Sequence, residues 1–228
     1  MSFPIATRAL ERLSLPISAE YENRALELES SIRSKRYSPT NAHELARMRV
    51  APSTTLFLEQ RNPNSQRVSL RQWELANQWV LEKIQTHAPV DVTAIINLHE
   101  ILFPEREGIF RGSPVMGGNT DYPEPGGLDE LWKRFSRLLE TEERSAIVFA
   151  SKVYQWLITL HFFADANGRL ARLAADWILL KEGLVPMSFP DDVASFVSAL
   201  GQENSLDPAG AVRLVCDAVK RSTLILSR

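Results

Sequence analysis

The chain has little cysteine and no long apolar run. Cys216 is the only cysteine among 228 residues, which excludes an internal disulfide and a cysteine metal cluster. No apolar segment approaches the roughly twenty residues that cross a membrane, and the amino terminus lacks the basic start and apolar centre of a secretory signal. We therefore expect a protein of the reducing cytoplasm that binds no membrane, with delivery into another cell left open.

Neither sign of charge is in large excess. The chain has 26 Lys and Arg against 28 Asp and Glu, a formal net charge of −2. This balance predicts no general affinity for nucleic acid or for acidic membranes, so any anion selectivity must come from a local pocket. With 44% hydrophobic and 24% charged residues, the composition is that of a globular protein with a core. Oligomeric state stays open.

One stretch of twelve residues gathers the chemistry, between two apolar segments of helical period. It reads His161-Phe162-Phe163-Ala164-Asp165-Ala166-Asn167-Gly168-Arg169-Leu170-Ala171-Arg172. Asn167-Gly168 predicts a tight turn at the start of the second helix, where unpaired N–H groups and the helix dipole favour an anion. Arg169 and Arg172 are three apart, so both guanidinium groups lie on one side of the first turn. This arrangement suits a polyphosphate.

Two more side chains of the stretch fit a reaction at phosphate. Asp165 can hold Mg²⁺, which is usually bound by one or two carboxylates together with phosphate oxygens. His161 titrates near neutral pH and could take a proton from an attacking hydroxyl. The alternative is a helix–loop–helix corner whose polar residues only cap helix ends. Six such groups in twelve residues favour the chemical interpretation.

The pattern His-x-Phe-x-Asp-Ala-Asn-Gly-Arg-x-x-Arg resembles the signature of the Fic (Fic/Doc) family, H-x-F-x-[D/E]-[A/G]-N-[G/K]-R-x-x-R. Phe162 departs from it, since most members carry proline there, and Ala166 stands where glycine is commonest. The resemblance covers roughly residues 68–205. It implies an all-α core with a small β-hairpin flap.

The resemblance also implies an activity, a nucleotidyltransferase that moves AMP from ATP onto a Tyr, Thr or Ser hydroxyl of a target protein. His161 would then deprotonate the hydroxyl, and Asp165 would hold Mg²⁺. The phosphate oxygens would be bound by Asn167, Gly168, Arg169 and Arg172. Transfer of UMP, phosphocholine or a γ-phosphate, and removal of AMP, stay open as alternatives. An interaction module without catalysis is the least favoured, because every reactive residue is present.

A second short motif lies near the amino terminus. Ser18, Glu22 and Asn23 match [S/T]-x-x-x-E-[G/N], the inhibitory motif of many Fic proteins, on a predicted helix with Ser18 as a good N-cap. A Glu22 carboxylate that reached Arg172 would form a charge-assisted pair and occupy the place of a terminal phosphate. The alternative is a solvated glutamate in an acidic helix.

Glycine and proline gather in residues 108–127, which excludes a helix after Gly112. The position resembles the Fic flap, which pairs with the backbone of the target, and we assign Ser113, Val115 and Met116 to that docking role. An ordinary long loop is the alternative. For the whole chain we predict an amino-terminal helical arm over 1–66, with the inhibitory motif, and the core domain over 67–228. The boundary is a loop at residues 62–65.

Overall fold

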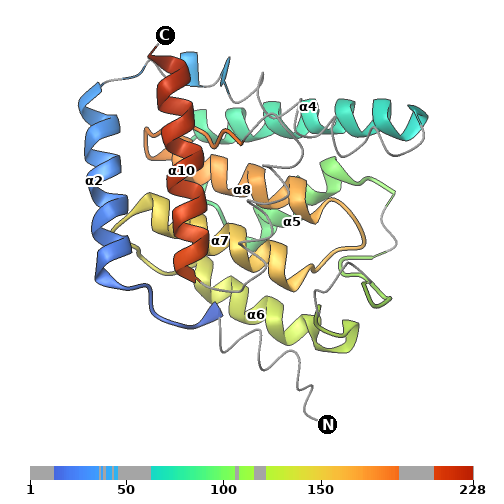
Figure 1. Cartoon of the computed structure of the whole chain (residues 1–228). Coiled ribbons are helices and arrows are strands. Elements are labelled where there is room, and N and C mark those ends of the chain that lie inside the picture. Colours follow the sequence, from blue (N-terminus) through green and yellow to red (C-terminus); the bar gives the residue numbers. More distant parts are fainter. Residues whose placement is uncertain are drawn as a thin grey trace.

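The computed structural model describes residues 13–35, 37, 40–42, 44–45, 63–105, 108–115, 122–189 and 208–227. Within these ranges the regular structure is helical and contains no strand (Figure 1), so the predicted all-α class is confirmed. The elements are α2 (Ala19–Lys35), α4 (Pro63–Gln85), α5 (Val92–Leu102), the 3-10 helix η1 (Pro125–Gly127), α6 (Leu128–Leu139), α7 (Ala146–Leu160), α8 (Asn167–Lys181) and α10 (Pro208–Leu226). None of these helices is long and apolar enough to cross a membrane.

Helices α7 and α8 form the centre of the fold. α7 begins after Ser145, whose hydroxyl accepts a hydrogen bond from the N–H of Val148 at 3.1 Å. Both helices are buried along most of their length, as expected for helices that are apolar on nearly every side. Residues 161–166 reverse the chain, so the two helices pack side by side as a hairpin (Figure 1).

The remaining helices surround this pair. α4 packs on α5 and α8, α6 packs on α7, and α10 packs on α7 and α2 (Figure 1). Large, fully buried side chains from several of these helices meet in one hydrophobic core, among them Trp73, Ile95, Phe135, Tyr154 and Trp177. The connection between α7 and α8 is therefore supported by a continuous core.

Helix α2 packs against the same core. Ala25 and Ile32 are buried within it, on the side that contacts α10 and α7. The predicted boundary at residues 66 and 67 falls inside α4. The expected loop is wrong from Pro63 onward, because α4 already begins there. Proline suits a first helical position, since its missing N–H would have no partner in the helix.

The amino terminus of α7 is capped by a carboxylate from α2. Glu29 is 5% exposed, and its Oε1 accepts hydrogen bonds from the Ser145 hydroxyl at 2.6 Å and from the Ile147 N–H at 2.9 Å. Such a position favours an anion because the first N–H groups of a helix have no intrahelical partner. Arg33 lies 3.7 Å from the other carboxylate oxygen. Glu29 thus fixes α2 at the beginning of α7.

We expect Glu29→Ala to lower the free energy of unfolding by about 2 kcal/mol, because it leaves the buried N–H of Ile147 without its acceptor. Glu27→Ala is the matched control, since Glu27 is exposed on the same helix, and should change stability by less than about 0.5 kcal/mol. Urea unfolding of both variants measures the difference. Equal and small effects would contradict the capping role.

Candidate active site

The twelve-residue stretch forms the connection between α7 and α8. α7 ends at His161, whose backbone is left-handed with φ 49° and whose N–H donates to the carbonyl of Leu157 at 3.3 Å. α8 begins at Asn167, directly after Ala166, which is also left-handed with φ 66°. These two conformations help the chain to reverse over residues 161–166. His161 and the first turn of α8 consequently lie at adjacent helix ends.

Two phenylalanines hold this loop to the core. Phe162 and Phe163 are both fully buried. Phe163 stacks on the imidazole of His99, with ring centroids 3.9 Å apart, and so anchors the loop to the core. Phe162, which stands where most family members carry proline, packs edge-on against Trp132 at 4.9 Å. Its ring adds to an aromatic cluster beneath the loop.

Asn167 closes the loop with both ends of its side chain. Its Oδ1 accepts from the N–H of Phe163 at 3.0 Å, and its Nδ2 donates to the carbonyl of Phe163 at 2.7 Å. The side chain is buried, so these contacts set the shape of the loop. The predicted contact of Asn167 with phosphate stays a prediction.

Asp165 presents an accessible carboxylate on this loop. Its side chain is 41% exposed, and its Oδ1 accepts from the N–H of Ala166 at 2.5 Å and lies 3.4 Å from Nη2 of Arg169. His99 is buried, with Nε2 3.0 Å from the backbone carbonyl of Asp165. The described residues contain no cluster of three or more metal-ligating side chains. One accessible carboxylate still fits Mg²⁺, which takes its other ligands from phosphate and water.

The two arginines occupy the first turns of α8. The Arg169 side chain is 12% exposed. Arg172 is buried, and its guanidinium carbon lies 5.8 Å from the ring centroid of Trp73, a cation–π contact. At Gly168 an added Cβ would meet Ile158 at an ordinary 3.9 Å, so packing alone does not demand glycine there. Positive charge thus gathers where the helix dipole favours an anion.

The surroundings of His161 favour its neutral form. Burial lowers the pKa of the imidazole, and the charge of Arg111 acts in the same direction, whereas the carbonyl of Ile158 and the charge of Asp165 oppose this. A neutral imidazole is the form that accepts a proton. The ring of Tyr122 lies beside it, with centroids 4.6 Å apart.

One turn beyond Arg172, α8 buries a carboxylate that the sequence analysis missed. Asp176 is 3% exposed, and its Oδ1 accepts from the N–H of Met187 at 2.7 Å. Burial raises the pKa of Asp176 to about 7, against the opposing effects of the Met187 hydrogen bond and the charge of Arg172. An aspartate four residues after an arginine was the available signal, because residues with this spacing share a helix face.

Arg111 is a second residue that the sequence analysis missed. Its side chain is 4% exposed; Nε donates to the carbonyl of His161 at 2.7 Å, and its backbone N–H donates to the carbonyl of Phe162 at 3.0 Å. Nη1 donates to the carbonyl of Ser113 at 3.0 Å and Nη2 to that of Pro123. The sequence signal was weak, a single arginine in a segment rich in glycine and proline.

Ala166 occupies a backbone conformation that suits glycine. Its φ of 66° brings Cβ close to the following carbonyl, at a cost of roughly 1–2 kcal/mol for a residue other than glycine. We expect Ala166→Gly to raise the free energy of unfolding by about 1 kcal/mol, because the greater chain entropy of glycine offsets part of the gain. Urea unfolding tests this, with Ala171→Gly in the body of α8 as a control that should lose stability. A loss in Ala166→Gly would contradict the prediction.

The predicted docking segment is described in part. Ser113 and Val115 lie within residues 108–115, and no strand occurs in those eight residues. Met116 lies outside the described residues. The hairpin and its docking role stay predictions.

The predicted inhibitory residues lie at the start of α2. The carbonyl of Ser18 accepts from the N–H of Glu22 at 3.2 Å, Glu22 is half-buried, and Asn23 is exposed. Two turns further along α2, Glu29 caps the first residues of α7. The signature begins at His161, directly after the last residue of α7. A helix of fifteen residues is about 22 Å long. In this arrangement α2 lies at the end of α7 away from the signature (Figure 1).

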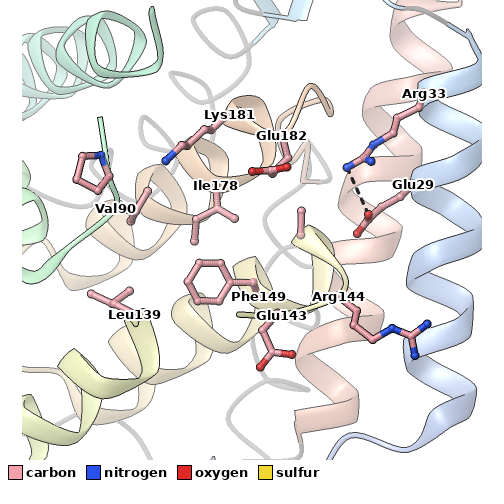
Figure 2. Close-up of a pocket in the computed structure, with 12 residues that line it drawn as sticks. Glu29, Arg33, Val90, Leu139, Glu143, Arg144, Phe149, Ile178, Lys181 and Glu182 are labelled. Carbon is pink, nitrogen blue, oxygen red and sulfur yellow. Dashed lines mark ion pairs between the residues drawn. The ribbon is translucent and has the colours of Figure 1, made fainter. Parts of the chain in front are cut away.

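A cavity of about 440 Å³ lies at that same end of the molecule (Figure 2). Its walls come from α2, the end of α6, the start of α7, the end of α8 and the segments just before α5 and α7. Apolar side chains, such as Phe149 and Ile178, and charged ones, such as Arg33 and Lys181, line it. None of the predicted site residues is among them, so this cavity is separate from the candidate active site.

Comparisons with known proteins agree with the motif. The model of the Fic/DOC family matches residues 89–179. A uridine 5'-monophosphate transferase of Xanthomonas campestris is 32% identical over 187 residues, which are 73% of this chain and 34% of the relative. A protein adenylyltransferase Fic of Drosophila melanogaster is 27% identical over 157 residues, which are 65% of this chain and 32% of the relative. The chain thus spans about a third of the length of these curated relatives.

Solved structures share the fold. IbpAFic2 covalently tethered to Cdc42 matches with a TM-score of 0.65 at 21% identity, over 95% of this chain and 75% of that one. Fic-1 from C. elegans matches with a TM-score of 0.63 at 18% identity, over 98% and 73%. Fold and loop together define a helical domain of the Fic type. The chain belongs to the Fic/DOC family.

Proposed function

We propose that the chain transfers a nucleotidyl group from a nucleoside triphosphate onto a hydroxyl of a target protein. One observation carries the proposal: the closed loop that sets His161 at the end of α7 near Asp165 and Arg169 at the start of α8. A neutral imidazole can accept a proton, and the helix start with its arginines favours phosphate. Relatives named for UMP transfer and for adenylylation support this class of reaction.

Each residue of the site has a separate role in the proposed reaction. His161 takes the proton of the target hydroxyl while the hydroxyl oxygen bonds to the α-phosphorus. The bond from this phosphorus to the bridging oxygen breaks, and pyrophosphate leaves. Arg169 and Arg172 stabilise the negative charge that grows on the leaving group. Asp165 would hold Mg²⁺, which when bound lowers the cost of that charge.

For the donor we propose ATP, with AMP as the group transferred. UTP is the second candidate, because the relative that is 32% identical is named a uridine 5'-monophosphate transferase. The arginines and the N–H groups at the start of α8 would bind phosphate groups. All nucleotides carry phosphate, so these contacts do not select the base. Phosphocholine transfer, γ-phosphate transfer and AMP removal would use the same phosphate contacts, and the donor incubation described next distinguishes them.

Incubation with ATP, UTP, GTP or CDP-choline and Mg²⁺, followed by intact mass of both proteins, identifies the donor. The chain itself and Cdc42, the protein tethered to a solved relative, are suitable trial acceptors. An added adenylyl mass supports AMP transfer, and an added uridylyl mass supports the second candidate. Loss of AMP from an adenylylated acceptor indicates the reverse reaction. No mass change with any donor or acceptor contradicts the proposed transfer.

Restraint of the activity by Glu22 stays a prediction. In this hypothesis the Glu22 carboxylate pairs with Arg172, while Glu29 fixes α2 at the beginning of α7. We expect Glu22→Gly to raise the initial labelling rate about tenfold, the value of one charge-assisted hydrogen bond, and Glu27→Gly to leave it unchanged. The increase should vanish in an Arg172→Ala background. An equal or lower rate in Glu22→Gly would remove the hypothesis.

A further inference from the structure

The junction between the catalytic loop and the predicted docking segment is built on one buried side chain. Arg111 donates to the carbonyl of His161 and, with its two Nη atoms, to the carbonyls of Ser113 and Pro123. We propose that Arg111 is a positioning residue that holds the backbone of His161, Ser113 and Pro123 in one fixed arrangement, and so sets the predicted docking residue Ser113 relative to the base. This inference rests on the proposed function, because it concerns the base and the docking segment of that reaction.

His161 has a left-handed backbone, with φ 49° and ψ 54°. This conformation is uncommon for residues other than glycine, so contacts with neighbouring residues help to maintain it. Arg111 supplies two of them: Nε holds the carbonyl of His161, and the backbone N–H holds the next carbonyl, that of Phe162. With two consecutive carbonyls held, the backbone of His161, and so the direction of its Cα–Cβ bond, is held as well.

The guanidinium group of Arg111 is planar and carries five N–H donors in a rigid fork. Its Nε donates to the carbonyl of His161, while its two Nη atoms donate to the carbonyls of Ser113 and Pro123. One rigid group therefore sets the separation between the backbone of His161 and the backbone at Ser113 and Pro123. A lysine ammonium is a single centre on a flexible stem, so it cannot satisfy three carbonyls in this geometry.

Arg111 also acts on His161 through its charge. The groups that face His161 are the guanidinium of Arg111, the carboxylate of Asp165, the carbonyl of Ile158 and the ring of Tyr122. Of the two charged groups, Arg111 lowers the pKa of His161 and Asp165 raises it. Arg111→Lys keeps a cation and loses the fork, whereas Arg111→Gln loses both. The two variants therefore separate position from charge.

The experiment compares Arg111→Lys and Arg111→Gln with Arg144→Gln, a control because Arg144 is exposed just before the far end of α7. We measure kcat and KM for the donor that the wild type uses, and the pKa of His161 by NMR, which the presence of only four histidines simplifies. Both Arg111 variants should lose about 10²-fold in kcat, the usual effect of misplacing a catalytic group by about 1 Å. Donor KM should change little, because Arg111 donates to the carbonyls of His161, Ser113 and Pro123, none of which is a predicted phosphate ligand.

The pKa of His161 separates positioning from a general loss of structure. In Arg111→Gln it should rise, which moves the acid limb of the pH–rate profile to higher pH. In Arg111→Lys it should stay close to the wild-type value while kcat still falls. Wild-type kcat in Arg111→Lys, or a loss that disappears after correction for the folded fraction in thermal unfolding, would overturn the proposal. An unchanged pKa in Arg111→Gln would overturn its electrostatic part.

Failure of the proposed function gives a different result. If the wild type transfers no group, the amide chemical shifts of His161 and Phe162 in Arg111→Lys still report the arrangement of the loop. Large shift changes in both residues support positioning by Arg111 whatever the reaction is. Wild-type shifts in a folded Arg111→Lys protein would overturn it.

Discussion

His161→Asn should lower the rate of nucleotidyl transfer by about 10²–10⁴-fold, the usual loss when a general base is removed, while donor binding stays close to that of the wild type. His161→Ala should have the same effect on transfer. Asparagine is the better replacement, because it tolerates the left-handed backbone that His161 adopts at φ 49°. Labelling rate measures the first quantity, and calorimetric titration of the donor measures the second.

The chain offers a matched control for this substitution. His87 is exposed and also left-handed, with φ 55°, at the end of α4 and outside the signature. His87→Asn should therefore keep the wild-type transfer rate while making the same chemical change in the same backbone conformation. Transfer by His161→Asn at nearly the wild-type rate would remove His161 from its role as the base.

Asp176→Asn should raise the free energy of unfolding by up to about 4 kcal/mol above pH 8 and change it little below pH 4. In the folded protein the pKa of Asp176 is about 7, above its ordinary value of 3.8. The folded state therefore binds this proton more tightly than the unfolded state, and the resulting stability is lost as pH rises through 7. Each pKa unit corresponds to about 1.4 kcal/mol. Asparagine has no proton to lose, and its amide oxygen can still accept from Met187.

Urea unfolding of the wild type and Asp176→Asn at a series of pH values between 4 and 9 measures this difference. Asp129→Asn is the control, because Asp129 is exposed in the first turn of α6, and its effect should depend little on pH. A stabilisation by Asp176→Asn that is independent of pH, or that is largest at pH 4, would contradict the assignment of a buried carboxyl with a raised pKa.

Asp176 also bears on the site, because the charge of Arg172 acts on it. Arg172 is buried, and its guanidinium group lies near the ring of Trp73. Asp176 follows Arg172 by one turn of α8. An uncompensated charge is costly in such a place. Above pH 7, where Asp176 ionises, its charge and the charge of Arg172 stabilise each other.

Most of the candidate site could be predicted from the sequence because its reactive groups are contiguous. His161, Asp165 and Arg169 lie within nine residues, and the two helical periods around them placed the groups on one helix–loop–helix connection. The same periodicity predicted the all-α class, which the described residues confirm. Local patterns of this kind depend on residues a few positions apart.

The sequence by itself determined which groups could react: a histidine, a carboxylate and two arginines at the mouth of a helix. Only the tertiary structure decided what holds them and what lies near them. Arg111 reaches His161 across fifty positions of the chain, and Glu29 caps α7 across more than a hundred. Such contacts depend on how helices pack, which no local periodicity encodes. For the same reason the structure alone placed α2 at the end of α7 away from the signature.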